Sequence, residues 1–550
     1  MALTPEALYA LLLGDEELAL LDVREARQAN RAHPNLARHA PLSTLELQIG
    51  AFVPRRGVPV VVYDEDDAPE GPAARAAAVL ARLGYGDVRR LAGGVAAWAV
   101  RGLPLVDGNN TLVKAFGDRV RQHYGTPVLA LDALEARRRA GRPTTVIDAR
   151  PRNEYAFLSI AGARNHPGTE LALRRYDGQG EDSDHDHDHD HDHLWAINCF
   201  SRTRGIIGTT TLRHLGLTDK AVFVEDGVMA WGLRGAPVVQ NARPEDTGDA
   251  LPLAAPEALR GLADALVARH GLPRIGTEGL ARLQADSTRT LYLFDVRPPE
   301  AQAGPAVPGL RHVAGGQVFM HFENLVGTRG ARVVLVDDAH GLRAAITAFW
   351  LTQLNQAEVY VLDGALPDAP AQAPASAASV PTAAEQGGID AAALRALRAA
   401  GTVDLVDVGP SLEYERQHLP DAFFLLPSRL AQADALLAAT GRTVVFSSPD
   451  GATARLAARD ALQRVPHGGG AQVAWLQGGT QAWQAGGGPV ESGVRHDRLL
   501  TPFDDDWGSV MRVFGPARDA AWADYLAWER GLSARVAQDA SVRFRFFDRS

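Results

Sequence analysis

Residues 144–150 read TTVIDAR, an apolar run rich in β-branched residues that ends in Asp-x-Arg. Related stretches occur three more times in this chain of 550 residues: LLDVRE at 20–25, LFDVRP at 293–298 and LVDVGP at 405–410. Continuous apolar runs of this kind are typical of parallel strands buried on both faces of an α/β sheet. Their return along the chain predicts a protein built from four repeats of one unit.

Each repeat also closes alike, with an apolar run, an Asp/Gly turn and, in three of the four, a tryptophan. The closing stretches are RLAGGVAAW at 90–98, FVEDGVMAW at 223–231, YVLDGALPD at 360–368 and WLQGGTQAW at 475–483. The opening aspartate and closing tryptophan are 76 residues apart in the first and fourth repeats and 83 apart in the second. The longer second repeat contains an alternating Asp/His tract, 181–193, which we interpret as a loop insertion.

Between these motifs, every repeat has a second apolar strand followed by an amphipathic helix. The predicted fold class is therefore α/β: four tandem domains, each a parallel-sheet α/β sandwich, followed by a C-terminal helical extension. The predicted boundaries are 1–107, 108–243, 244–368 and 385–492 for the domains and 493–550 for the extension. We interpret the aromatic-rich extension as packing material rather than as part of a site.

Composition excludes several classes of function. The net charge of −10 argues against nucleic-acid binding, and no apolar run approaches the roughly 18 residues of a membrane span. The N-terminus lacks the leading basic residues of a secretory signal, and the single cysteine favours a reducing compartment, so we expect a cytoplasmic protein. No cofactor is expected, because neither a Walker A nor a dinucleotide-binding motif is present.

The single cysteine, Cys199, lies in WAINCFSRTRGIIG, 195–208, between the second strand of its repeat and the following helix. The corresponding positions in the other repeats are Asp64, Asp337 and Ser447. A helix N-terminus and two nearby arginines are features that lower the pKa of a thiol and make it reactive. The alternative is an inert thiol buried at a strand end.

Taken together, these motifs resemble the rhodanese family of sulfurtransferases, with four tandem rhodanese domains. The resemblance rests on the strand-end DVRE, DARP and DVRP, on SIAGARNHP at 159–167 and HLPDAFFLLP at 418–427, on the loop CFSRTR at 199–204, and on the closing stretches. It covers roughly residues 10–490. The loop also resembles the active loop of bacterial multidomain rhodaneses linked to thiol oxidation.

The resemblance implies that Cys199 is the catalytic residue and carries sulfur as a persulfide. Because a carboxylate or hydroxyl cannot do so, the first, third and fourth domains should be inactive. The substrate-binding residues implied are Phe200, Ser201, Arg202, Thr203, Arg204 and Gly205, whose backbone N–H groups would surround the anionic sulfur. Arg204 would close this cradle, and Arg202 would face the entrance and attract an anionic donor. The opening aspartates recur with Arg24, Arg150 and Arg297 in repeats without a thiol, which indicates structural pairs or caps.

The expected function is transfer of sulfane sulfur from thiosulfate or a small persulfide to cyanide or a thiol. The partners are then a small anionic donor and its acceptor. An alternative is a carrier or scaffold that exchanges sulfur with a partner protein. A phosphatase or arsenate reductase is a third reading, which the loop disfavours because only four residues separate Cys199 from Arg204, one fewer than in the related dual-specificity phosphatases.

No metal centre is predicted. The Asp/His tract offers His185, His187, His189, His191 and His193, which suit opportunistic binding of zinc, nickel or copper. Their spacing is not that of a preformed site, and we favour a mobile low-complexity loop. The intervening strand, at ~3.3 Å per residue, separates the tract from Cys199 by roughly 17–20 Å, which argues against a catalytic role.

Overall fold

A computed structural model describes residues 2–176, 192–247, 250–301, 309–364, 387–467 and 469–548. Within these ranges the chain forms four five-stranded sheets, and the strands within each of them pair in parallel. This confirms the predicted α/β class and its repetition. Of the helices in the described ranges, none combines the length and apolar character needed to cross a membrane.

Unit 1 shows the topology that all four units share. Its strands are β1 (Ala2–Leu3), β2 (Ala19–Asp22), β3 (Arg38–His39), β4 (Val60–Tyr63) and β5 (Val88–Leu91), in the spatial order β1-β5-β4-β2-β3. Its helices are α1 (Pro5–Leu13), α2 (Ala26–Ala29), α3 (Leu45–Phe52), α4 (Pro72–Arg82) and α5 (Gly94–Val100). The two central strands, β2 and β4, are buried along their whole length, as their uninterrupted apolar sequences require.

Unit 2 repeats this order as β6-β11-β10-β7-β9 and adds a small antiparallel pair, β8 with β12. The strands are β6 (Val128–Leu129), β7 (Thr144–Asp148), β8 (Ser159–Ile160), β9 (Arg164–Asn165), β10 (Leu194–Asn198), β11 (Ala221–Val224) and β12 (Val238–Val239). The helices are α6 (Thr111–Tyr124), α7 (Leu131–Arg139), α8 (Arg152–Phe157), α9 (Thr203–His214) and α10 (Gly227–Leu233).

Unit 3 has the order β13-β17-β16-β14-β15. Its strands are β13 (Arg274–Ile275), β14 (Leu291–Asp295), β15 (Leu310–His312), β16 (Arg332–Val336) and β17 (Glu358–Leu362). Its helices are α11 (Pro256–His270), α12 (Thr277–Ala285), α13 (Gly315–Met320), α14 (Phe322–Leu325) and α15 (Leu342–Leu354).

Unit 4 has the order β18-β22-β21-β19-β20. Its strands are β18 (Gly388–Ile389), β19 (Val403–Asp407), β20 (Phe423–Phe424), β21 (Thr443–Ser447) and β22 (Gln472–Leu476). Its helices are α16 (Ala391–Ala399), α17 (Ser411–Arg416), α18 (Asp434–Leu437), α19 (Ala452–Leu462) and α20 (Gly479–Ala485).

The opening Asp-x-Arg motif forms an ion pair at the end of a central strand in three units. The pairs are Asp22 with Arg24 at 2.6 Å, Asp148 with Arg150 at 2.7 Å, and Asp295 with Arg297 at 2.6 Å. Asp148 and Arg150 are fully buried. A buried carboxylate needs such a partner, so the motif is structural, as its recurrence without a thiol indicates.

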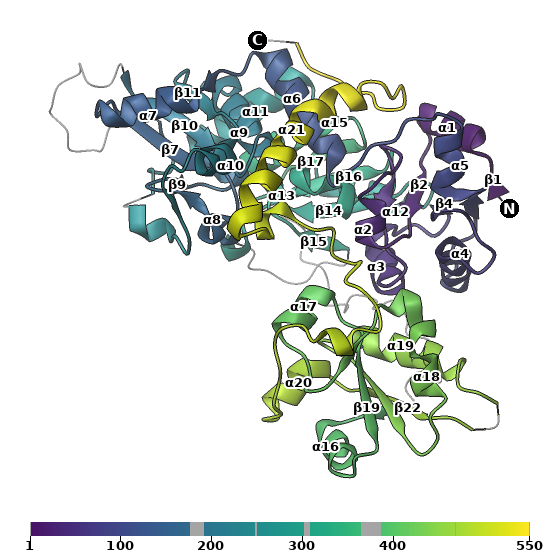
Figure 1. Cartoon of the computed structure of the whole chain (residues 1–550). Coiled ribbons are helices and arrows are strands. Elements are labelled where there is room, and N and C mark those ends of the chain that lie inside the picture. The colour runs from purple at the N-terminus through teal and green to yellow at the C-terminus, as the bar shows by residue number, and fades with distance from the viewer. Residues whose placement is uncertain are drawn as a thin grey trace.

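Units 1 to 3 share one apolar core, to which Trp98, Phe116 and Trp350 contribute from successive units. The apolar clusters of unit 4 contain only its own residues and the segment that follows it. That segment leads to α21 (Arg518–Val536), which crosses unit 2 and packs on α6 and α10 (Figure 1). The chain therefore folds back on itself, and its last helix lies beside its second unit.

Candidate functional site

Cys199 lies directly after β10, at the carboxyl end of a central strand of unit 2. Asn198, the last residue of β10, pairs with Asp148 of β7, and α9 begins four residues after Cys199, at Thr203. Ligands of parallel sheets bind at such strand ends. Only 2% of the Cys199 surface is exposed.

The closing motif of unit 2 is hydrogen-bonded to the backbone of the cysteine loop. The backbone N–H groups of Val228 and Met229, in the first turn of α10, donate to the carbonyls of Cys199 and Phe200, each at 3.0 Å. Gly227 has φ +60°, and a Cβ built there would lie 2.3 Å from the Cys199 carbonyl oxygen. The glycine of the Asp/Gly turn is therefore required for the close approach of the two segments.

Strand pairing identifies the residues that replace Cys199 in the other units, and corrects one prediction. In unit 4, Ser447 pairs with Asp407 as Asn198 pairs with Asp148, and the Thr480 N–H donates to the Ser448 carbonyl. The counterpart of Cys199 is therefore Ser448, and the prediction of Ser447 was wrong by one residue. The same pairing places Asp64 and Asp337 at this position in units 1 and 3.

In those three units the replacing side chain caps the start of the following helix. The bonds are Ala73 N–H to Asp64 Oδ2 at 2.8 Å, Ala344 N–H to Asp337 Oδ2 at 3.2 Å, and Ala454 N–H to Ser448 Oγ at 3.2 Å. In unit 2 the corresponding N–H, that of Gly205, acts on the Cys199 thiol and lowers its pKa. The position that carries oxygen in the other units thus carries sulfur in unit 2.

A cavity of about 150 Å³ opens on Cys199. Five of the predicted site residues line it: Cys199, Phe200, Ser201, Thr203 and Arg204. Other parts of the chain supply the remaining wall: Asn110, Lys114 and Glu154 of unit 2, Met320 and His321 of unit 3, and Trp507, Ser509, Val510, Met511, Tyr525 and Glu529 of the C-terminal extension. Five segments far apart in sequence therefore enclose the thiol.

Arg204 is held in place at the cavity by Glu154 of α8. Its two terminal nitrogens donate to the two carboxylate oxygens at 2.7 and 2.6 Å, a bidentate pair. The guanidinium also lowers the pKa of the Cys199 thiol, and burial has the opposite and larger effect. Of the two arginines in the loop, Arg204 is the one that lines the cavity with Cys199.

Arg202 and Gly205 do not line this cavity. Arg202 is 8% exposed and its terminal nitrogens donate to Asp118 of α6 and to Asp226, the residue before α10. It lines a different cavity, of about 430 Å³, with Arg121 and Arg530. The structure therefore places Arg202 behind the loop rather than at the entrance, because two buried carboxylates hold it there.

The thiol pKa also differs from the expectation. Burial raises the pKa of Cys199 to about 11, although Arg204 and the Gly205 N–H lower it; the charges of Glu529 and Asp148 raise it further. The sequence features that favour a thiolate are present, but burial outweighs them. A nucleophilic role at neutral pH needs a group that takes the thiol proton.

The C-terminal extension forms part of the cavity wall, which the sequence analysis did not predict. Trp522 packs edge-on against Phe200, with ring centroids 5.6 Å apart, and Gly232 of α10 leaves room for the indole. On α21 the buried positions are Trp522, Leu526, Glu529, Leu532, Ser533 and Val536. The sequence does contain a signal for this role, because Glu529 is a charged residue on the otherwise apolar face of α21.

Metal binding by the Asp/His tract lies largely outside the described residues. His193 lies within them, and its Nε2 is 3.1 Å from the Thr145 hydroxyl. Among described residues, Asp337, Asp338 and His340 have ligand-type atoms within 4.8 Å of one another. The Arg343 guanidinium contacts all three side chains. The positive charge at this cluster is therefore supplied by the protein's own arginine.

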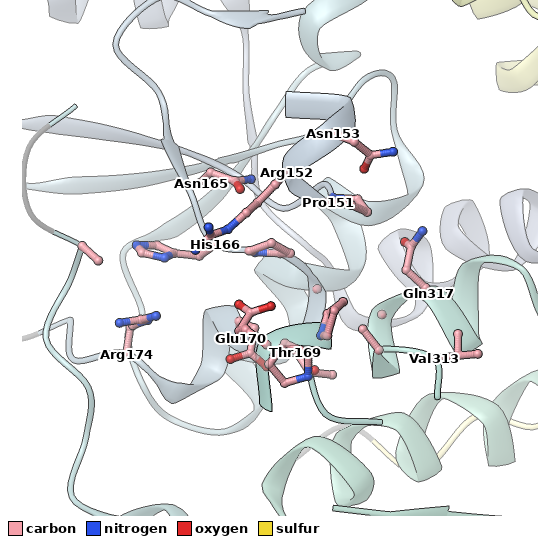
Figure 2. A pocket seen from close by; sticks show the side chains of 18 residues that line it. Pro151, Arg152, Asn153, Asn165, His166, Thr169, Glu170, Arg174, Val313 and Gln317 are labelled. Carbon is pink, nitrogen blue, oxygen red and sulfur yellow. The ribbon is translucent and has the colours of Figure 1, made fainter. Parts of the chain in front are cut away.

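A further cavity, of about 450 Å³, lies between units 2 and 3 and does not include Cys199 (Figure 2). Its walls come from the segments that follow β7 and β9 in unit 2 and β14 and β15 in unit 3, with Arg152, His166, Val313 and Gln317 among the labelled side chains. Gly168 and Gly316 meet at its floor, where a Cβ on Gly168 would lie 2.9 Å from the Gly316 Cα.

The site is a buried cysteine at the carboxyl end of a central parallel strand, and three further α/β units have an aspartate or a serine at the same place. The sequence profile of the rhodanese-like domain family matches residues 4–101, 130–233 and 390–486. The chain therefore belongs to the rhodanese-like domain family. Unit 3, which the profile does not match, has the same strand order as the other units.

Solved structures provide the second comparison. A thiosulfate sulfurtransferase from Pseudomonas aeruginosa is 33% identical, with 100% of both chains covered and a TM-score of 0.87. A rhodanese from E. coli is 28% identical over 16% of this chain and 99% of its own, with a TM-score of 0.15. A rhodanese-related protein from Thermoplasma volcanium is 20% identical over 19% of this chain and 97% of its own, with a TM-score of 0.17. A search of curated proteins finds no match.

Proposed function

We propose that this protein is a sulfurtransferase in which Cys199 takes sulfane sulfur from thiosulfate or a small persulfide and passes it to cyanide or a thiol. The observation that carries the proposal is the cysteine loop of unit 2. It presents a thiol to a helix N–H and to Arg204, in a chain whose full length matches a thiosulfate sulfurtransferase. Thiol sulfur in such a cradle suits nucleophilic attack on a sulfane sulfur.

The cavity supports a small donor. With 2% of Cys199 exposed and about 150 Å³ of space, the site suits a molecule the size of thiosulfate. A loop of a partner protein would need α21 to move. The carrier reading, in which Cys199 exchanges sulfur only with a protein, is therefore the second candidate.

The other units support a single reaction centre. Asp64, Asp337 and Ser448 each bond the N–H that would face a bound sulfur, and none of them can hold a persulfide. Units 1, 3 and 4 are then frameworks around unit 2. Of these units, only unit 3 contributes described residues to the wall of the cavity, and the C-terminal extension completes it.

The test is thiocyanate formation from thiosulfate and cyanide by the purified chain. We expect turnover for the wild type, none for Cys199→Ser, and unchanged turnover for Ser448→Ala, the matched change in unit 4. Mass spectrometry should find one added sulfur on Cys199 after thiosulfate alone. Turnover by Cys199→Ser refutes the proposal, and added sulfur without turnover favours the carrier.

A further inference from the structure

Glu529 is a buried carboxyl group beside the thiol, supplied from outside the four units. It lies on α21, is 3% exposed, and lines the same cavity as Cys199. Its charge is close enough to raise the pKa of the Cys199 thiol. The Thr203 hydroxyl donates to Oε1 at 3.5 Å, whereas Oε2 is buried with no hydrogen bond of normal geometry from the described residues.

The surroundings of Glu529 suit a carboxyl group that changes its protonation state. Burial raises its pKa, while the Lys114 ammonium, the Ser201 hydroxyl and Arg202 oppose that rise. Buried carboxyl groups balanced in this way titrate nearer to neutral pH than exposed ones, as general bases do.

The other titratable groups of the cavity are less suited to accept a proton. Both oxygens of Glu154 are bound to Arg204. Lys114 donates to the Asn109 carbonyl at 2.5 Å and lies over the rings of Tyr525 and Trp528, contacts that fit an ammonium. Burial and the Arg204 charge lower the pKa of His321, which disfavours protonation of its ring, and its Nδ1 lies 3.5 Å from the Asn110 amide.

We propose that Glu529 accepts the proton of the Cys199 thiol and returns it at the end of each cycle, an inference that rests on the proposed sulfurtransferase function. The S–H bond breaks as its proton moves to the Glu529 carboxylate. The sulfur pair then attacks the sulfane sulfur of thiosulfate, and the S–S bond breaks with its pair leaving on sulfite. Cyanide attack on the outer sulfur of the persulfide releases thiocyanate and the Cys199 thiolate, which takes the proton back.

Proton transfer inside the cavity also conserves its total charge. Before the transfer Glu529 is the anion and Cys199 is neutral, and afterwards the reverse holds. The negative charge moves onto the atom that the Gly205 N–H and Arg204 stabilise. Thiolate can therefore form without loss of a proton to water, and its amount should depend little on external pH.

The experiment is the pH dependence of Cys199 alkylation by iodoacetamide in the wild type and in Glu529→Gln. Between pH 6 and 8 we expect the wild-type rate to change by less than about threefold. The rate of Glu529→Gln should rise about tenfold per pH unit, because its thiolate forms only by loss of the proton to solvent. Asp524→Asn, at an exposed position of the same helix, should behave as the wild type.

A purely electrostatic role predicts equal slopes for the two proteins. Removing the negative charge of Glu529 would then only lower the thiol pKa, so both rates would rise about tenfold per pH unit, with Glu529→Gln the faster. Parallel profiles overturn the proposal. Glu529→Asp, which keeps a carboxylate, should retain a flat pH profile, and a steep profile for this folded variant would also overturn it.

Alkylation needs no sulfur donor, so this test is separate from the proposed function. The matched measurement with thiosulfate is the single-turnover release of sulfite, whose pH dependence should steepen in Glu529→Gln as that of alkylation does. A flat alkylation profile without sulfite release would retain the proton transfer and reject thiosulfate as the donor.

Discussion

At the residue scale, Asp407 is the opening aspartate that has no arginine partner, and it shows what the Asp-x-Arg ion pair contributes in the other units. Unit 4 has Gly409 in its place, and among the residues that the structure describes the Gly409 N–H and the Ser447 hydroxyl bond the buried carboxyl. Burial raises the pKa of Asp407 to about 7, and these hydrogen bonds lower it. An unfolded aspartate titrates near 4, so the fold favours the protonated acid.

We therefore predict that unit 4 loses stability as pH rises. A carboxyl pKa that is higher in the folded state gives stability that is complete below about pH 4 and is lost up to about pH 7, roughly 4 kcal/mol for ~3 pKa units. Hydrogen exchange of β19 and β21 measured between pH 5 and 8 should reveal this loss. Asp407→Asn should flatten the dependence and the exposed Asp450→Asn should not; equal slopes for both would contradict the assignment.

Gly227 provides a second residue-scale prediction. Gly227→Ala places a Cβ against the Cys199 carbonyl at a positive φ, and Gly235→Ala meets a similar φ, +70°, with no atom within 4 Å. Backbone strain costs each variant about 1–2 kcal/mol. Only Gly227→Ala should also displace the cysteine loop and lower sulfur-transfer activity by about 100-fold or more. Equal activities of the two variants would show that the loop does not depend on this contact.

At the scale of the element, α21 holds the wall of the cavity through Trp522. The indole is 2% exposed and lies between Phe200 and Gly232. Trp522→Ala should destabilise the docked helix by about 3–5 kcal/mol and speed alkylation of Cys199. Phe514→Ala, in the same extension but 57% exposed, should change stability by less than about 0.5 kcal/mol. Unchanged alkylation of Trp522→Ala would mean that α21 does not limit access.

Element placement also separates what the sequence predicts well from what it does not. The strands were predictable because β2 and β10 carry uninterrupted apolar runs, and the repeat of motifs disclosed their common order. Two features of the site could not be predicted, because they join residues far apart in the chain and periodic patterns report only local structure. They are the pairing of Arg202 with Asp118 and the approach of Glu529 to Lys114. The sequence predicts a lowered pKa for the Cys199 thiol, whereas the structure raises it, because burial depends on how the cavity is assembled. The Ser447 assignment failed because one residue of register cannot be seen without strand pairing.

At the scale of the whole molecule, unit 4 differs from the others in how it is attached. Arg459 makes a bidentate pair with Glu46 of unit 1, at 2.8 and 2.9 Å, and Arg75 donates to the Ser428 carbonyl. Units 1 to 3 are joined instead by a common apolar core. The attachment of unit 4 should therefore be more sensitive to salt.

We predict that Arg459→Ala loosens unit 4 without unfolding it. The two side chains are each 20% exposed, and a surface pair of this kind contributes about 0.2–1 kcal/mol. The effect should therefore be seen as a larger radius of gyration in small-angle X-ray scattering, and high salt should reproduce it in the wild type. Arg464→Ala, which removes a pair with Asp434 inside unit 4, is the control. No difference between the two variants would place the attachment elsewhere.

The position of Glu529 in the chain has a consequence for synthesis. It is 330 residues after Cys199, so at roughly 5–20 residues per second the ribosome makes it some 15–65 s later. Until α21 is made, the cavity around Cys199 lacks the wall that this helix provides. A nascent chain interrupted before α21 would therefore present a less protected cysteine to the cell's oxidants.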